Sequence, residues 1–166
     1  MTATVTFYDY TSTGGNTETQ LASGPFTSLM TSDSHDSGTT YQSNPITVPG
    51  SSNAYSYERI IAAKWTSTYN TISAVLFWKS AGSLSDAALI INAGTSASRA
   101  TPVITASSVA TSAIPTSSGT ALSVTVTGST PNTVSYYIYM QLVVPSTVTT
   151  PGDIGTQTCT LQYDES

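Results

Sequence analysis

The feature that most constrains the fold is a period-two alternation of polar and apolar residues, repeated along the chain. It is strongest from Val134 to Val144, where β-branched and aromatic residues predominate. No stretch shows the 3.6-residue period of an amphipathic helix. The pattern therefore predicts an all-β fold, an antiparallel β-sandwich of jelly-roll-like type with eight or nine short strands and under about 10% helix. The other expected strands are Thr2–Tyr10, Tyr55–Thr66, Thr71–Lys79, Ala87–Ala93, Leu122–Val126 and Thr156–Tyr163, with weaker ones at Ile46–Val48 and Val103–Thr105.

The connections between these stretches suggest how the chain is organised. Residues 68–70 form a short link between two strong strands, which predicts that these two strands pair antiparallel. The length of 166 residues suits a single β-sandwich domain over residues 1–166. Residues 11–52 are expected to form a long polar loop or arm, either self-packed or reaching a neighbouring molecule. Residues 96–120 are similar in composition, and we expect them to pack on their own domain.

Side-chain parity selects the candidate core. Within each expected strand, alternate large apolar residues should face the interior. In Thr71–Lys79, the dense apolar run suggests that both faces of the strand are buried. Leu76 and Trp78 are assigned to the core together because they share one face of this strand. The full set is Ile61, Trp65, Leu76, Trp78, Leu89, Val124, Ile138, Met140, Leu142 and Leu161.

Charge is scarce and excludes several classes of protein. Only 8% of residues are charged, with four Lys or Arg against nine Asp or Glu, while 58 of the 166 residues are Ser or Thr. Four scattered cations cannot form the basic surface that a nucleic-acid partner requires. No apolar run approaches the roughly 18 residues of a membrane-spanning helix, and no signal peptide is expected at the N-terminus. We therefore expect neither a nucleic-acid nor a membrane partner.

Two further residues are predicted to have structural roles. The single cysteine, Cys159, lies in an alternating stretch and is expected to be a small buried side chain. Arg59 follows Glu58 in a strand, so the two side chains should point to opposite faces. Arg59 is expected to bond a carboxylate or carbonyl on its own face.

The densest polar cluster is Asp33-Ser34-His35-Asp36-Ser37. A catalytic triad is assembled across a fold, so neighbouring Ser, His and Asp in one loop do not indicate one. Asp33 and Asp36 could offer oxygen ligands to calcium, but they lack the spacing of a calcium loop. The preferred interpretation of this segment is therefore a solvated loop tip. No carboxylate pair stands out for glycosidase chemistry. We expect no enzyme activity, catalytic residue, cofactor or metal.

Tyrosines supply the remaining candidate site. Tyr137 and Tyr139 share one face of a strand, and tyrosines suit an interface in which the ring packs while the hydroxyl stays hydrated. The candidate interface residues are therefore Tyr137, Tyr139, Asp33, His35 and Asp36. The alternative is a carbohydrate-stacking platform made from Trp65, Trp78, Tyr136, Tyr137 and Tyr139.

From about Ala54 onward, seven strand and turn segments form a recognisable series: Ser56–Ile61, Ile72–Ser80, Thr95–Val103, Thr111–Thr116, Tyr139–Val144, Pro151–Gly155 and Tyr163–Glu165. Through these segments, the chain resembles small virion structural proteins of tailed bacteriophages and related viruses, of the capsid-decoration and accessory kind. The segments are strand and turn features, and no functional residues are carried over with them. The first fifty residues have no counterpart in the resemblance.

The resemblance implies a β-sandwich located in the virion, most simply a capsid decoration or cement protein that coats or stabilises the particle. Its expected partners are further copies of itself, assembled as a trimer, and a major capsid or tail protein. A carbohydrate- or receptor-binding β-sandwich module of a virion or cell surface remains the alternative.

Overall fold

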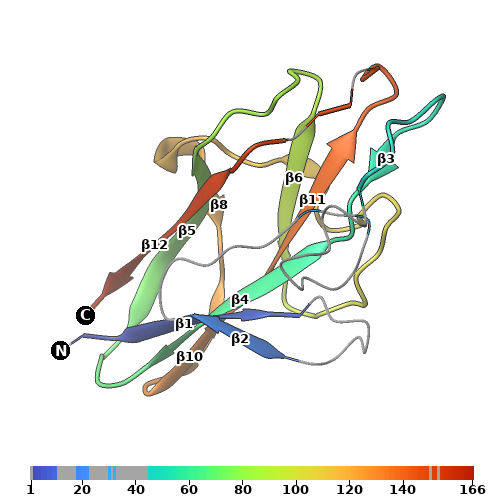
Figure 1. Ribbon diagram of the computed structural model, residues 1–166. Coiled ribbons are helices and arrows are strands. Elements are labelled where there is room, and N and C mark those ends of the chain that lie inside the picture. Colours follow the sequence, from blue (N-terminus) through green and yellow to red (C-terminus); the bar gives the residue numbers. More distant parts are fainter. Residues whose placement is uncertain are drawn as a thin grey trace.

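The computed structural model describes residues 2–10, 18–22, 30, 32, 45–149, 151–152 and 154–166. It is nearly all β, with 47% strand and 2% helix, and its strands form antiparallel sheets of nine and three strands. Figure 1 shows the two sheets as separate layers, with β12 and β5 in one and β4, β11 and β6 in the other. The expected antiparallel β-sandwich is confirmed.

The larger sheet is built around β4 and β11, which pair through Ile61 and Ile138. Its main order is β2 (Thr19–Ala22), β1 (Thr4–Asp9), β4 (Arg59–Thr66), β11 (Tyr137–Val144), β6 (Ile90–Ser96) and β7 (Ser112–Ala113). Off this path, β10 (Asn132–Ser135) pairs with β4 and with β9 (Val126–Ser129), and β3 (Ala54–Tyr55) pairs with β11. The smaller sheet has the order β12 (Thr158–Glu165), β5 (Ile72–Ala81) and β8 (Leu122–Ser123). A single 3₁₀ turn, η1 (Ser118–Thr120), completes the described elements.

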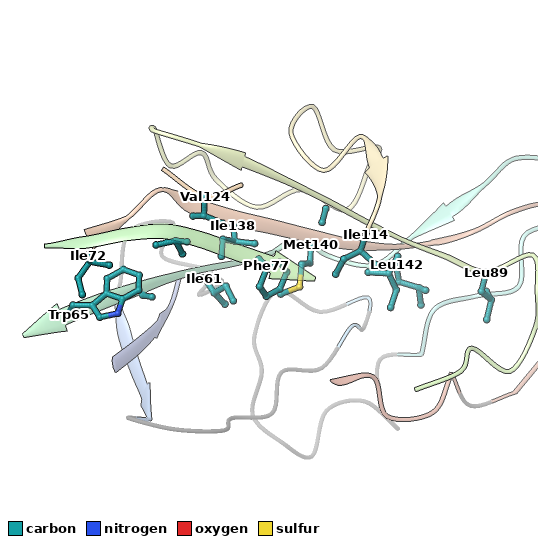
Figure 2. Packing of buried hydrophobic residues seen from close by; sticks show 14 of the residues in the cluster. Ile61, Trp65, Ile72, Phe77, Leu89, Ile114, Val124, Ile138, Met140 and Leu142 are labelled. Atoms are coloured by element: carbon teal, nitrogen blue, oxygen red, sulfur yellow. The ribbon is translucent and has the colours of Figure 1, made fainter. Parts of the chain in front are cut away.

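The main core fills the space between the sheets. Figure 2 shows side chains of both sheets meeting there, among them Trp65 and Leu142 of the larger sheet and Phe77 of the smaller. Of the ten predicted core residues, seven are buried: Ile61, Trp65, Leu89, Val124, Ile138, Met140 and Leu142. Leu161 is half-buried and packs against this core.

The prediction was wrong for one strand, β5. Val75 and Phe77 face the core there, while Leu76 and Trp78 are only half-buried. The cause is an extra residue in β5: three steps from Ser73 to Leu76 lie opposite two steps of β12, and Ala74 adopts a φ of 48°. Such a bulge moves the inward-facing positions from even-numbered to odd-numbered residues. An assignment of faces that assumes unbroken alternation therefore selects the wrong side of the strand beyond the bulge.

The predicted pairing across residues 68–70 was also wrong. β4 belongs to the larger sheet and β5 to the smaller, so this link crosses between layers. The chain turns at Ser67, whose φ is 88°, and Tyr69 is buried in the link. The Tyr69 hydroxyl donates to the Trp65 carbonyl at 3.1 Å and accepts the Thr133 amide at 2.8 Å. These bonds hold the crossing in place.

Several short elements differ from expectation. The stretch Leu122–Val126 does not form one strand, because β8 joins the smaller sheet and β9 the larger. Residues 46–48 and 103–105 are not strands. Val103 instead exchanges two hydrogen bonds with Glu58, one through its backbone carbonyl and one to the Glu58 carboxylate.

The two long polar segments are placed in part. Within 11–52, residues 19–22 form β2 against β1, so this portion packs on its own sheet. Within 96–120, the described chain covers the outer face of the larger sheet: Val109 and Ala110 pack on Tyr139. Self-packing of residues 96–120 is confirmed.

Two of the single-residue expectations can be compared with the structure. Cys159 is exposed, which corrects the expectation of a buried side chain, because it lies where β12 enters the sheet with a register shift. Arg59 is fully buried and lies on the same sheet face as Ile61. The register with β1 places the buried Asp9 on that face as well, opposite Ile61. A carboxylate therefore lies on the face where the partner of Arg59 was expected.

Candidate interaction site

A cluster of tyrosines lies on the outer face of the larger sheet. β1 and β11 flank β4, and their residues on this side alternate with those that face the main core. Tyr10 and Tyr139 are buried here with Ile60, and the half-buried Tyr8 and Tyr137 pack against them. The rings of Tyr10 and Tyr137 meet edge-on, with centroids 5.1 Å apart. The sheet thus carries a second, aromatic cluster on the side away from the main core.

Charged side chains surround this cluster. Lys64 Nζ lies 4.1 Å from the Tyr8 ring centroid, and the Arg99 guanidinium lies 5.0 Å from that of Tyr10. Both distances allow cation–π attraction. Two of the four cations in the chain are therefore held beside tyrosine rings. We call the following six residues the tyrosine–cation patch: Tyr8, Tyr10, Glu18, Lys64, Arg99 and Tyr137.

Glu18 links the patch together. Its carboxylate accepts a hydrogen bond from the Tyr10 hydroxyl at 2.9 Å and forms an ion pair with Lys64. Desolvation opposes the charged form of Glu18, but the hydrogen bonds from Lys64 and Tyr10 outweigh it, so the pKa of this carboxyl is lowered. Burial, together with the bond to Glu18, raises the pKa of Tyr10. At neutral pH the Tyr10 phenol thus stays neutral and donates its hydrogen bond to a charged Glu18 carboxylate.

The two predicted interface tyrosines have different surroundings. Tyr137 is half-buried within the tyrosine–cation patch. Tyr139 is 1% exposed, which differs from the hydrated hydroxyl expected for it. Its hydroxyl accepts the Ala100 amide at 2.7 Å and donates to the Ser98 carbonyl at 3.2 Å, and burial raises its pKa. The chain's own loop has taken the position that a partner was expected to fill.

The other predicted interface residues, Asp33, His35 and Asp36, lie outside the described residues. The calcium hypothesis for that loop therefore stays a prediction. Within the described ranges, no group of three His, Cys, Asp or Glu side chains could hold a metal ion.

The aromatic residues considered for a carbohydrate platform lie on different surfaces. Trp65 is buried in the main core, and Tyr136 packs against that core. Trp78 lies on β5, with its neighbour Phe77 facing the core, and Tyr137 lies on the outer face of the other sheet. Of the five, only Tyr137 and Tyr139 lie together on the outer face of the larger sheet. The five rings therefore do not form one platform.

Sequence reasoning missed Gln141, which holds the covering loop onto β11. This side chain is 1% exposed, and its amide nitrogen donates to the Ser56 carbonyl at 2.9 Å and the Thr105 carbonyl at 2.8 Å. Its oxygen accepts the Ser107 amide at 2.9 Å. The signal was present, since Gln141 is the sole amide side chain in a strand of otherwise apolar and aromatic residues. A polar residue in such a strand indicates a buried hydrogen-bond network.

Comparison with protein-family models finds no match to this chain, and comparisons with curated proteins and with solved structures find no significant similarity. In the part of the chain that the structure describes, no helix is both long and apolar enough to cross a membrane.

Proposed function

We propose that this chain is a structural virion protein, most simply a capsid decoration protein that binds copies of itself and a major capsid or tail protein. The observation that carries the proposal is the tyrosine–cation patch. Its half-buried tyrosines each combine a packed ring with a polar hydroxyl. Tyrosine is one of the residue types enriched at protein interfaces. Its cations are already paired with rings and a carboxylate, so covering them on binding costs less than covering unpaired charges would.

The scarcity of charge elsewhere supports the same function. A surface rich in Ser and Thr hydroxyls can be buried against a neighbour at a lower desolvation cost than charged groups, and hydroxyls bond across an interface in either direction. Attachment through such contacts should depend only weakly on salt, because few ion pairs form between partners. Proteins that coat a particle in many copies can gain stability from many modest contacts of this kind.

The test is to measure this chain in gradient-purified virus particles by quantitative mass spectrometry. Wild-type protein should be present in many copies per particle. Tyr8→Ala with Tyr137→Ala should lower the copy number at least about tenfold, because interface tyrosines carry a large share of binding energy. Tyr57→Ala is the matched control, since Tyr57 is also half-buried but lies outside the patch. Absence of the wild-type chain from particles, or equal occupancy of all variants, would overturn the proposal.

A carbohydrate- or receptor-binding module is the second candidate. The observation that favours it is that Glu18, Lys64 and Arg99 surround the tyrosines, because sugar sites combine aromatic faces with polar groups. Glycan-array binding by the isolated protein, abolished by Tyr8→Ala and retained by Tyr57→Ala, would favour this candidate over the first.

A further inference from the structure

One edge of the smaller sheet is open. β12 pairs with β5, and within the described part of the chain no strand pairs with its other side. In Figure 1, β12 forms the left margin of the molecule, with β5 on its inner side. The eight residues of β12 include neither Pro nor Lys, two residues that commonly protect exposed edges. Its charged residues, Asp164 and Glu165, are confined to one end.

The side of β5 that faces away from β12 is occupied. β8 pairs with Leu76 and Phe77 of β5. Beside it, the Val124 amide donates to the Val75 carbonyl at 2.8 Å, and the Lys79 amide donates to the Pro115 carbonyl at 2.8 Å. Among the described residues, the backbone of β5 is therefore hydrogen-bonded on both sides, whereas that of β12 is paired on one. This difference makes β12 the longest unpaired edge in the described part of the smaller sheet.

Strand length indicates which strand could cover this edge. Among the described edge strands, β2 and β9 have four residues each, and β3, β7 and β8 have two each. Of the described edge strands, only β12 itself has eight residues. We propose that two copies of this chain pair antiparallel through their β12 edges, which joins two three-stranded sheets into one of six strands. Such a contact is two-fold symmetric, because the same surface serves on both copies.

Backbone geometry restricts the register of this contact. Antiparallel partners that exchange hydrogen bonds must both direct their amides outward, so paired residue numbers must add up to an even number. The register centred on Leu161 meets this rule and pairs Thr158 with Asp164 and Thr160 with Gln162 of the partner copy. It separates the two Asp164 carboxylates by about 20 Å along the strands, at about 3.4 Å per residue. The acidic ends thus do not repel each other.

The inference deepens the self-association in the proposed function and rests on that part of it, but its test needs no particle. Sedimentation velocity of the full chain over a wide concentration range should show a dimer. Thr160→Lys with Gln162→Lys places lysines opposite each other across the two-fold axis, and should raise the dimer dissociation constant by about tenfold or more. The control is Thr127→Lys with Ser129→Lys, which adds the same charge at exposed positions of the β9 edge. Circular dichroism checks that both variants fold.

The control should dimerise as the wild type does. A monomeric or trimeric wild-type protein would overturn the inference, and a monomer would leave the β12 edge to a strand of a different protein. Equal dimerisation of the β12 variant and the wild type would also overturn it. Loss of the chain from particles while the isolated dimer persists would count against the virion function alone.

A disulfide tests the register. Thr158→Cys with Asp164→Cys, in a Cys159→Ser background, should form covalent dimers on oxidation. Within one chain these positions lie about 20 Å apart along the strand, well beyond the roughly 7 Å that a disulfide spans. Each single variant is the control, because its new cysteine faces no cysteine of the partner. Absence of covalent dimers from the double variant, or equal amounts from the single ones, would overturn this register.

Discussion

The ring of Tyr163 meets that of Trp65 edge-on, with centroids 5.3 Å apart, and this contact joins the two sheets. Trp65 lies on β4 of the larger sheet and Tyr163 on β12 of the smaller. Edge-on aromatic pairs add to the stability gained from burial alone. The core of this sandwich therefore contains a specific contact at the end where the chain crosses from one sheet to the other.

The first prediction concerns the two tryptophans. Trp65→Ala should lower the free energy of unfolding by about 3–5 kcal/mol, because the side chain is fully buried. Trp78→Ala should lower it by only about 1–2 kcal/mol, because Trp78 is half-buried. Urea denaturation measures both values. Equal losses would contradict the assignment of β5 faces that follows from the bulge at Ala74.

The second prediction concerns Gln141. Replacing it with Leu leaves the Ser107 amide and the Thr105 carbonyl without this partner, so the free energy of unfolding should fall by about 1–3 kcal/mol. Hydrogen exchange at the Ser107 amide should become faster. Gln20→Leu, at an exposed position of β2, is the control and should change stability by no more than about 0.5 kcal/mol. A stable Gln141→Leu protein with unchanged exchange would show that the loop is held by other contacts.

The third prediction is a pH dependence that arises from Glu18. Its pKa is lowered in the folded protein from an ordinary value of 4.5, so its charged form adds stability above that value. This contribution is lost as the pH falls through the folded pKa. The difference in unfolding free energy between wild type and Glu18→Gln should therefore be positive at pH 7 and disappear below the folded pKa. A difference that stays constant with pH would rule out the ion pair with Lys64 as its source.

The fourth prediction concerns the reactivity of Cys159. Although the residue is exposed, desolvation of the thiol outweighs the nearby Lys79 charge and raises its pKa to about 11. Because the thiolate is the reactive form, alkylation at pH 8 should be slower than for an ordinary cysteine, whose pKa is about 8.5. The rate should rise with pH toward a midpoint near 11. Alkylation in urea provides the control, and a native midpoint near the urea value would contradict the prediction.

Much of the fold could be predicted from the sequence because strand alternation is a local signal. β11 is an example: Ile138, Met140 and Leu142 face the core as their parity requires. The alternation cannot show which strands share a sheet, so it predicts antiparallel pairing across the link at 68–70, although this link joins two layers. It also cannot show a bulge, and one extra residue near Ala74 was enough to reverse the faces of β5.

The candidate site was less predictable, because it depends on pairing between distant strands. The sequence singled out Tyr137 but gave no reason to place it beside Tyr10, which precedes it by more than a hundred residues. Lys64 lies over Tyr8 because β1 and β4 pair antiparallel in one particular register. The cover over Tyr139 depends on how the loop at 98–110 folds back, which alternation does not encode.

The pairing of β5 with β12 has a consequence for the order of events during synthesis. β12 leaves the ribosome after every other described strand, while β5 emerges about eighty residues earlier and has only the two-residue β8 to pair with until then. In a nascent chain, one backbone edge of β5 would therefore stay unpaired until β12 has emerged. Long-range pairing of this kind is slow and leaves unpaired strands open to aggregation. Expression at a reduced rate or temperature should accordingly raise the soluble yield.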